Sequence, residues 1–290
     1  MTVTIDPTAA TRTVTIAALA TRHGKELLFA PRLAAIGIDV QVSPVDTDAF
    51  GTFAGEIDRS GTARAVVEAK ARAAIECSGA SIGLASEGSF GPHPVVPFAR
   101  LDTELVAWVD AASDRTIIEG VSEFSHVPGP VVLEAPPGDI AAEVLPISTG
   151  LADQAAIVCI EPADGSRRIV VAKGVVDPAV LRGAIDEAFV RDAGRVVVEP
   201  DLRAHLCPDR RRVIAAAIDR LVLRLASRCP QCDAVGFGRL RTMPGLPCAL
   251  CDLPTTEVAV IVDGCEVCGC ERHTERTGRA DPTHCDRCNP

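Results

Sequence analysis

The sequence lacks any apolar run that approaches the roughly 18 residues needed for a membrane-spanning helix. Its first residues also lack the basic start and apolar stretch of a secretory signal peptide. Lysine is scarce: the chain has 26 arginines but only Lys25, Lys70 and Lys173, so each lysine is singled out as a candidate functional residue. The net charge of −10 argues against general affinity for nucleic acid or an anionic membrane surface. We therefore expect a cytoplasmic protein.

Cysteine is abundant by contrast, with twelve residues. In a reducing compartment, clustered cysteines favour metal ligation over disulfides. Eight of them form four Cys-x-x-Cys pairs: Cys229 and Cys232, Cys248 and Cys251, Cys265 and Cys268, and Cys285 and Cys288. One pair presents two thiolates at a tight turn, and a second pair completes a tetrahedral site. The sequence predicts two structural zinc ions. Sequential pairing is the first interpretation, and interleaved pairing (first with third, second with fourth) is the alternative.

The cysteine-rich segment, residues 229–290, carries six Arg and nine Asp or Glu, a net charge of −3. It has no basic stripe that would bind nucleic acid, although many zinc ribbons do so. Contact with a protein partner is therefore the alternative role for this segment. Cys270, His273 and His284 are expected to be neighbours of the metal sites rather than ligands.

The pattern upstream predicts an α/β domain over residues 1–228, with a mixed sheet and flanking helices. A Pro- and Gly-rich crossover near residues 126–140 could join two lobes. A long amphipathic helix begins at Pro208, because apolar residues recur at helical spacing on one face. A tandem zinc-ribbon module over residues 229–290 follows. Residues 87–97 are rich in Gly and Pro and are expected to form an irregular loop.

The first candidate binding segment, residues 21–26, follows a strand and opens a helix. Backbone N–H groups at such a point, together with a lysine, suit an anion such as phosphate. The candidate ligand-binding residues are Thr21, His23 and Lys25. A solvated helix start is the alternative.

The second candidate segment, residues 85–94, follows an apolar strand. Ligands gather at the carboxyl ends of strands in open α/β sheets. Glu87 could serve as a metal ligand or a general base, and with Glu56 and Asp58 it could form an oxygen-rich Mg²⁺ site. The other candidates in this segment are Ser86, Ser89 and His93. A structural turn that buries Phe90 is the alternative.

The third candidate segment contains Asp201, Arg203 and His205. These residues alternate along the chain, so an extended backbone would place them on one face. The arrangement favours contact with a substrate. A salt-bridged entry into the following helix is the alternative.

Several segments of the chain together resemble a bacterial family known only as a domain of unknown function. The segments are ATRHGKE, DTDAFGTFAGEIDR, ASEGSFGPHP, DLRAH and ADPTHCDRCNP. The resemblance covers most of the chain, but it implies no known activity.

A more distant resemblance is to the inosine triphosphate pyrophosphatase superfamily, in the loop 20–25, in Lys70-Ala71 and in Glu87-Gly88. It implies that Lys25 and Lys70 bind a nucleoside triphosphate. Glu87, with Glu56 or Asp58, would hold Mg²⁺ and activate a water. The chain departs from that pattern, since His23 replaces an asparagine and Glu87 an aspartate.

These observations lead us to expect a zinc-binding protein that acts as a magnesium-dependent nucleotide pyrophosphatase, a hydrolase of phosphoanhydrides. Its partner would be a small phosphorylated ligand. A non-enzymatic protein that binds a small anion, or an adaptor that contacts a partner through its ribbons, is the alternative.

Overall fold

The computed structural model describes residues 14–51, 59, 61–93, 96, 99–144, 147, 151, 153–191 and 194–290. The chain forms two compact units, and the division between Leu221 and Val222 falls inside helix α6 (Pro208–Ala226). No helix in the described part of the chain is long and apolar enough to cross a membrane.

The first unit contains a five-stranded mixed sheet, as the sequence predicts. Its strands are β1 (Thr15–Ala20), β2 (Ile38–Ser43), β3 (Ile82–Pro92), β4 (Arg100–Asp110) and β5 (Arg115–Phe124), and their order is β2-β1-β3-β4-β5. β1 pairs in parallel with β2 and β3, whereas β4 is antiparallel to both β3 and β5.

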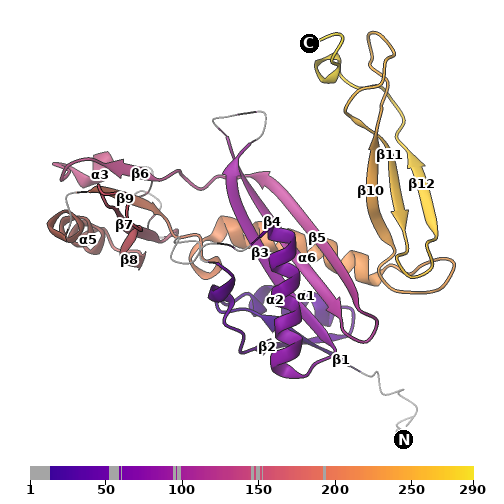
Figure 1. Ribbon diagram of the computed structural model, residues 1–290, viewed down its shortest axis with the longest axis horizontal. Coiled ribbons are helices and arrows are strands. Elements are labelled where there is room, and N and C mark those ends of the chain that lie inside the picture. Colours follow the sequence, from indigo (N-terminus) through magenta and orange to yellow (C-terminus); the bar gives the residue numbers. More distant parts are fainter. Residues whose placement is uncertain are drawn as a thin grey trace, which may run out of the picture. The chain divides into compact units, whose positions relative to one another are not determined.

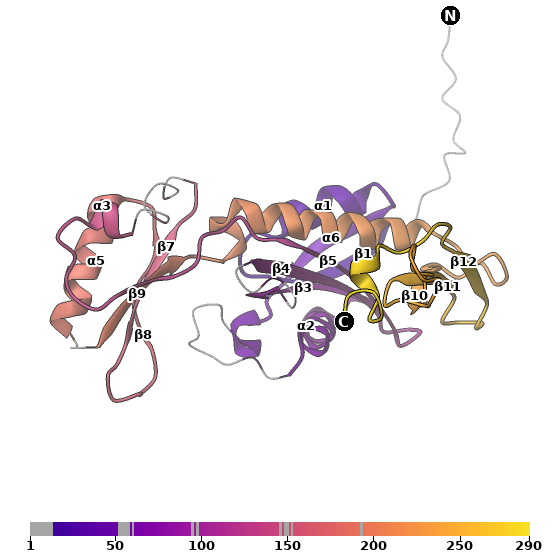
Figure 2. The same cartoon turned by 90° about the horizontal axis from the view of Figure 1, so that it is seen from above.

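Helices cover both faces of this sheet: α1 (Glu26–Ala34) and α6 lie on one face and α2 (Ala63–Ser78) on the other (Figures 1 and 2). The apolar face of α6 is buried as its periodicity predicts, with Ile214, Ala217 and Ile218 at 0% exposure. The approach of α2 to β3 requires Gly83, because a Cβ there would lie 2.0 Å from the carbonyl oxygen of Ala71.

A second sheet in the same unit has four antiparallel strands in the order β6-β9-β7-β8. They are β6 (Val131–Leu133), β7 (Ala156–Glu161), β8 (Ile169–Val175) and β9 (Arg195–Pro200), packed with α3 (Ile140–Glu143) and α5 (Pro178–Arg191). Asp177 caps α5, since its Oδ1 accepts hydrogen bonds from the backbone N–H groups of Ala179 and Val180. Short 3-10 helices are η1 (Thr47–Phe50), η2 (Ala204–Leu206) and η3 (Pro282–His284).

The loop predicted from residue 87 onward is wrong over its first half. β3 continues through this stretch and pairs with β4 from Glu87 opposite Leu105 to Pro92 opposite Arg100. Strand pairing with a long neighbour overrides the turn propensity of Gly88 and Gly91. The proline does not interrupt the ladder, because it is the last residue of the strand.

The second unit is built on three antiparallel strands, β10 (Gly238–Pro244), β11 (Val258–Gly264) and β12 (Glu271–Glu275). Arg224, in the last turn of α6, joins the helix to this sheet. Its Nε donates to the carbonyl oxygen of Gly236 at 2.8 Å and its Nη1 to that of Arg239 at 2.7 Å. Gly238 is required beside it, because a Cβ there would lie 2.6 Å from the Arg224 side chain.

Candidate functional site

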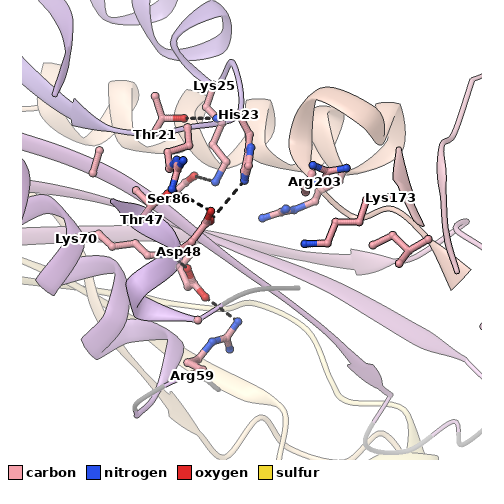
Figure 3. A pocket seen from close by; sticks show the side chains of 16 residues that line it. Thr21, His23, Lys25, Thr47, Asp48, Arg59, Lys70, Ser86, Lys173 and Arg203 are labelled. Carbon is pink, nitrogen blue, oxygen red and sulfur yellow. Dashed lines mark hydrogen bonds and ion pairs between the residues drawn. The ribbon is translucent and has the colours of Figure 1, made fainter. Parts of the chain in front are cut away.

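A cavity of about 210 Å³ lies in the first unit, where β1 ends (Figure 3). β1 leads through α1 to β2 on one side, whereas β3, which follows α2, pairs with β1 on the other side. Open α/β sheets bind ligands at such a reversal of strand order, beyond the carboxyl ends of the strands. The basic residues that line the cavity are Arg22, Lys25, Arg59, Lys70, Lys173, Arg203 and Arg210. The others are Ala20, Thr21, His23, Thr47, Asp48, Gly51, Ser86, Glu87 and Ile157.

Positive charge is concentrated in this cavity although the whole chain has a net charge of −10. All three lysines of the chain line it. Among the described residues, five carboxylates pair with its basic groups, namely Asp46, Asp48, Glu87, Glu104 and Asp201. The seven basic side chains outnumber them, so the cavity suits an anion that carries several negative charges.

Residues 21–25 carry the chain from β1 into α1. Lys25 occupies the N-cap position of the helix, and Gly24 before it adopts the left-handed region with φ of 69°. The backbone N–H of His23 donates to Thr21 Oγ1 at 3.4 Å. The first turn of a helix has N–H groups without intrahelical partners and a positive dipole end, both of which favour an anion. The helix start predicted at this position is therefore present at the edge of the cavity.

Lys25 reaches across the cavity wall to β3, where its Nζ donates a hydrogen bond to Ser86 Oγ at 2.8 Å. Burial, reinforced by the positive charge of Arg210, lowers the pKa of Lys25 from 10.5 to about 7. A substantial fraction of this lysine is therefore neutral near pH 7, and a bound anion would favour its protonated form.

Glu87 lies on the opposite face of β3 from Ser86, because successive side chains of a strand alternate. Its Oε2 accepts from Lys70 Nζ at 2.6 Å, and its Oε1 pairs with Arg59 Nη2 at 2.7 Å. Arg59 also donates to the carbonyl oxygen of Gly88. Both carboxylate oxygens of Glu87 are thus engaged by cations, so in this arrangement Glu87 orients two basic groups.

Two histidines stack at the mouth of the loop after β1. The rings of His23 and His205 lie 5.2 Å apart with an interplanar angle of 24°. Burial lowers the pKa of His23 to about 4 even though Asp48, 3.7 Å from its Nε2, opposes this shift. Burial also lowers the pKa of His205. His23 is therefore neutral at pH 7 and can offer hydrogen bonds but no charge.

In the third predicted segment, Arg203 lines the cavity and Asp201 orients the Arg203 side chain. Arg203 lines the cavity, and its Nε donates to both carboxylate oxygens of Asp201, at 3.0 and 3.1 Å. The Asp201 side chain is fully buried, and its Oδ2 also accepts from the backbone N–H of Gly174 at 3.1 Å. Asp201 therefore orients Arg203 and is hydrogen-bonded to β8. His205 is not a lining residue of the cavity, but its ring stacks on that of His23, which is.

Some predicted site residues lie elsewhere or cannot be placed. Ser89 lines a neighbouring cavity, and the ring of His93 stacks on Phe124 at a centroid distance of 5.2 Å. Glu56 and Asp58 fall outside the described residues. Among the predicted residues that are described, the cavity thus unites Thr21, His23, Lys25, Lys70, Ser86, Glu87 and Arg203.

Sequence reasoning missed several basic groups of the cavity: Arg22, Arg59 and Arg210. In a chain with 26 arginines, no local pattern distinguishes these from surface arginines. Arg210 is 1% exposed and pairs through Nε with Glu104 Oε1 at 2.5 Å. Lys173 was singled out by its rarity but not assigned to the site. For these four residues, the scarcity of lysine, which singled out Lys173, was thus the one usable indication.

The second unit brings the eight paired cysteines into two tetrads. The tetrads are Cys229, Cys232, Cys265 and Cys268, and Cys248, Cys251, Cys285 and Cys288, with the Sγ atoms of each tetrad within 4.8 Å of one another. The Sγ–Sγ distances between Cys229 and Cys268, Cys232 and Cys265, Cys248 and Cys288, and Cys251 and Cys285 are 3.6 to 3.9 Å. Tetrahedral Zn²⁺ with Zn–S bonds of about 2.3 Å implies thiolates about 3.8 Å apart, whereas a disulfide requires about 2.05 Å. The cysteines therefore fit a four-coordinate metal ion.

Each Cys-x-x-Cys pair forms the same turn. In all four, the backbone N–H of the residue four positions after the first cysteine donates to the carbonyl oxygen of that cysteine; the donors are Asp233, Asp252, Gly269 and Asn289. Three of these residues, Asp233, Asp252 and Gly269, have positive φ values between 60° and 73°. The turn leaves N–H groups near the sulfur, as at Cys229 Sγ, which accepts from the N–H of Gln231 at 3.4 Å.

The sequential pairing preferred from the sequence is wrong, and the interleaved alternative is confirmed. Each connecting strand runs away from one metal site to the other: β10 leads from the first pair to the second, β11 returns to the third, and β12 leads to the fourth. A seven-residue strand such as β10 spans about 20 Å, so consecutive pairs lie at opposite ends of the sheet. Cys270, His273 and His284 are outside both tetrads.

Fold and sites together define an α/β protein with a basic cavity and a C-terminal unit containing two cysteine tetrads. A family model described as a domain of unknown function, DUF6671, matches residues 70–126 and 155–290. These residues make up most of the chain, so the protein belongs to this family, in agreement with the resemblance of its motifs. No curated protein matches the chain.

Solved structures show only weak similarity. The PelC dodecamer from Paraburkholderia phytofirmans is 14% identical over 39% of this chain and 73% of that chain, with a TM-score of 0.20. Lipoprotein GNA1162 from Neisseria meningitidis is 12% identical over 47% of this chain and 94% of that chain, with a TM-score of 0.21. TM-scores this low support no conclusion about fold or function.

Proposed function

We propose that this protein binds a small phosphorylated molecule in the basic cavity of its first unit. We also propose that two structural Zn²⁺ ions, each held by four thiolates, maintain the fold of its second unit. The observation that carries the first proposal is the convergence of all three lysines of the chain on one cavity. The positive end of the α1 dipole beside Lys25 adds a field that favours a phosphate group.

The anion proposal is tested by calorimetric titration with inorganic pyrophosphate. Lys173 is an exposed cavity residue on β8, so Lys173→Gln should remove one charge with little effect on folding. We expect pyrophosphate affinity to fall about tenfold, which corresponds to about 1.4 kcal/mol. Arg182→Gln on α5 is the matched control, since Arg182 is exposed and pairs with Asp186, one turn away on the same helix. Absence of pyrophosphate binding, or equal losses in the two variants, would refute the proposal.

Binding through basic side chains is favoured over a magnesium-bridged pyrophosphatase. Among the described residues that line the cavity, the acidic ones are Asp48 and Glu87. Arg22 pairs with Asp48, while Lys70 and Arg59 pair with Glu87. Mg²⁺ prefers carboxylate and water oxygens in octahedral geometry, and this set offers few of them. We therefore expect pyrophosphate to bind equally well with and without Mg²⁺.

Zinc binding and its pairing are tested by metal analysis of double variants. Cys229→Ser with Cys265→Ser disrupts one tetrad, so the protein should retain one zinc ion. Cys229→Ser with Cys248→Ser disrupts both tetrads, so it should retain none. Sequential pairing predicts the reverse for the two variants. A wild-type protein with no bound zinc would reject the metal assignment itself.

A further inference from the structure

Lys25 and Ser86 form a pair whose chemistry goes beyond anion binding. The Lys25 side chain comes from the start of α1 and the Ser86 side chain from β3, and both line the cavity. Their 2.8 Å separation, Nζ to Oγ, is within the range in which one group takes a proton from the other. A serine hydroxyl is a weak nucleophile until a neighbouring base removes its proton.

The surroundings of Lys25 favour its neutral form, which is the form that can accept a proton. The charged groups that act on it come from several elements: Arg210 on α6, Lys70 on α2, Glu104 on β4 and Glu87 on β3. His23, in the same loop as Lys25, is neutral and adds no charge. Burial and the positive charges outweigh the two carboxylates, and the pKa of Lys25 falls to about 7. At pH 8 most of this lysine therefore carries a free lone pair.

We propose that Ser86 is a nucleophile that accepts a phosphoryl group, with Lys25 as its general base. Ser86 Oγ attacks phosphorus, the Oγ–P bond forms, and the bond from phosphorus to the leaving oxygen breaks with its electron pair. The hydroxyl proton passes to Lys25 Nζ and from there to the leaving oxygen. Water then hydrolyses the phosphoserine and restores the free hydroxyl.

The cavity can stabilise the charge of this step. Phosphoryl transfer depends mainly on positioning and on cations around the non-bridging oxygens. Lys70 and Arg210 line the same cavity. The N-terminus of α1 is close to Ser86, because its N-cap residue Lys25 is hydrogen-bonded to Ser86. The substrate class of this step rests on the phosphorylated ligand proposed above. The identity of the nucleophile can be tested without that ligand.

The test treats the full-length protein with a fluorophosphonate, an electrophile at phosphorus that releases fluoride, and measures adducts by intact-mass spectrometry and peptide mapping. We expect a single adduct on Ser86, with a labelling rate that rises as the pH passes through about 7. Ser86→Ala should abolish the adduct. Ser89→Ala, on the same strand, is the matched control and should label like the wild type.

The role of Lys25 is tested by Lys25→Arg, which keeps a positive charge but remains protonated. Labelling should slow by about 100-fold, the lower end of the usual contribution of a general base. An unlabelled wild type, an adduct at another residue, or an unchanged rate in Lys25→Arg would overturn the proposal. Labelling and calorimetry are both carried out on the wild type: pyrophosphate binding without labelling overturns the nucleophile alone, and labelling without pyrophosphate binding overturns the anion site alone.

Discussion

Asp102 on β4 provides a quantitative test of the packing behind the cavity. Its side chain is fully buried, and neither carboxylate oxygen has a hydrogen-bond partner among the described residues. Burial, together with the nearby charge of Glu104, raises the pKa of Asp102 from 3.8 to about 8. The folded protein therefore holds a proton on this group that the unfolded chain releases above pH 4.

The sign of the effect follows from proton linkage. Between pH 4 and pH 8 the folded state binds one more proton than the unfolded state, so this group lowers stability as the pH rises. Each pH unit in this window costs about 1.4 kcal/mol, which gives about 4 kcal/mol at pH 7. Asp102→Asn keeps the shape of the protonated acid and cannot ionise. We expect it to unfold like the wild type at pH 4 and to be more stable by up to about 4 kcal/mol at pH 7.

The assay is urea unfolding followed by tryptophan fluorescence. Trp108 is the only tryptophan of the chain, and its position six residues along β4 places it on the same face as Asp102, so it reports on this unit. Asp39→Asn, an exposed carboxylate on β2, is the control and should change little. A variant whose stability follows the wild type at every pH, or falls below it at pH 7, would refute the reasoning.

Three further predictions concern local packing and the metal sites. Gly88→Ala should destabilise the first unit by about 1–3 kcal/mol in urea unfolding, because a Cβ at this position would lie 2.2 Å from Glu104 Oε1. Gly91→Ala is the control and should have little effect, because a Cβ there would have no atom within 4 Å. A strong chelator should expose the second unit to proteolysis without changing Trp108 fluorescence, and protection that survives demetallation would contradict a structural role for the metal. Cys270→Ser should retain two zinc ions by metal analysis, because Cys270 is outside both tetrads, and the loss of one ion would contradict the assigned ligands.

The regular elements of the first unit were predictable where local pattern and tertiary packing agree. Helix α6 follows a helical apolar period, and α2 is capped by Thr62, whose Oγ1 accepts from the backbone N–H of Ala65 at 3.2 Å. The continuation of β3 beyond Glu87 was not predictable, because its glycines and proline indicate a turn. The facing strand β4, whose paired residues lie 8 to 18 positions further along the chain, supplies the pairing that makes this stretch extended.

The cavity was predictable in part, namely where its residues directly follow strands. Residues 21–25, 86–87 and 203 were identified because they follow strands, where ligands gather in such sheets. Arg59 and Arg210 were not, since each reaches the cavity through tertiary packing that no local pattern encodes. The acid Glu87 was interpreted as a metal ligand. Its two cationic partners, Lys70 and Arg59, come from segments that the sequence alone does not place beside it.

The second unit shows how ligand spacing and strand length jointly determine a fold. In each pair the first cysteine is buried, and these four residues are Cys229, Cys248, Cys265 and Cys285. Apart from them, the buried apolar side chains of residues 229–290 are Phe237, Leu246, Val262 and Ala280. So small an apolar core contributes little free energy of folding. With the two proposed metal ions in place, metal–thiolate bonds would stabilise both ends of the sheet. Because each strand links one tetrad to the other, we expect that loss of either ion loosens every strand of the unit.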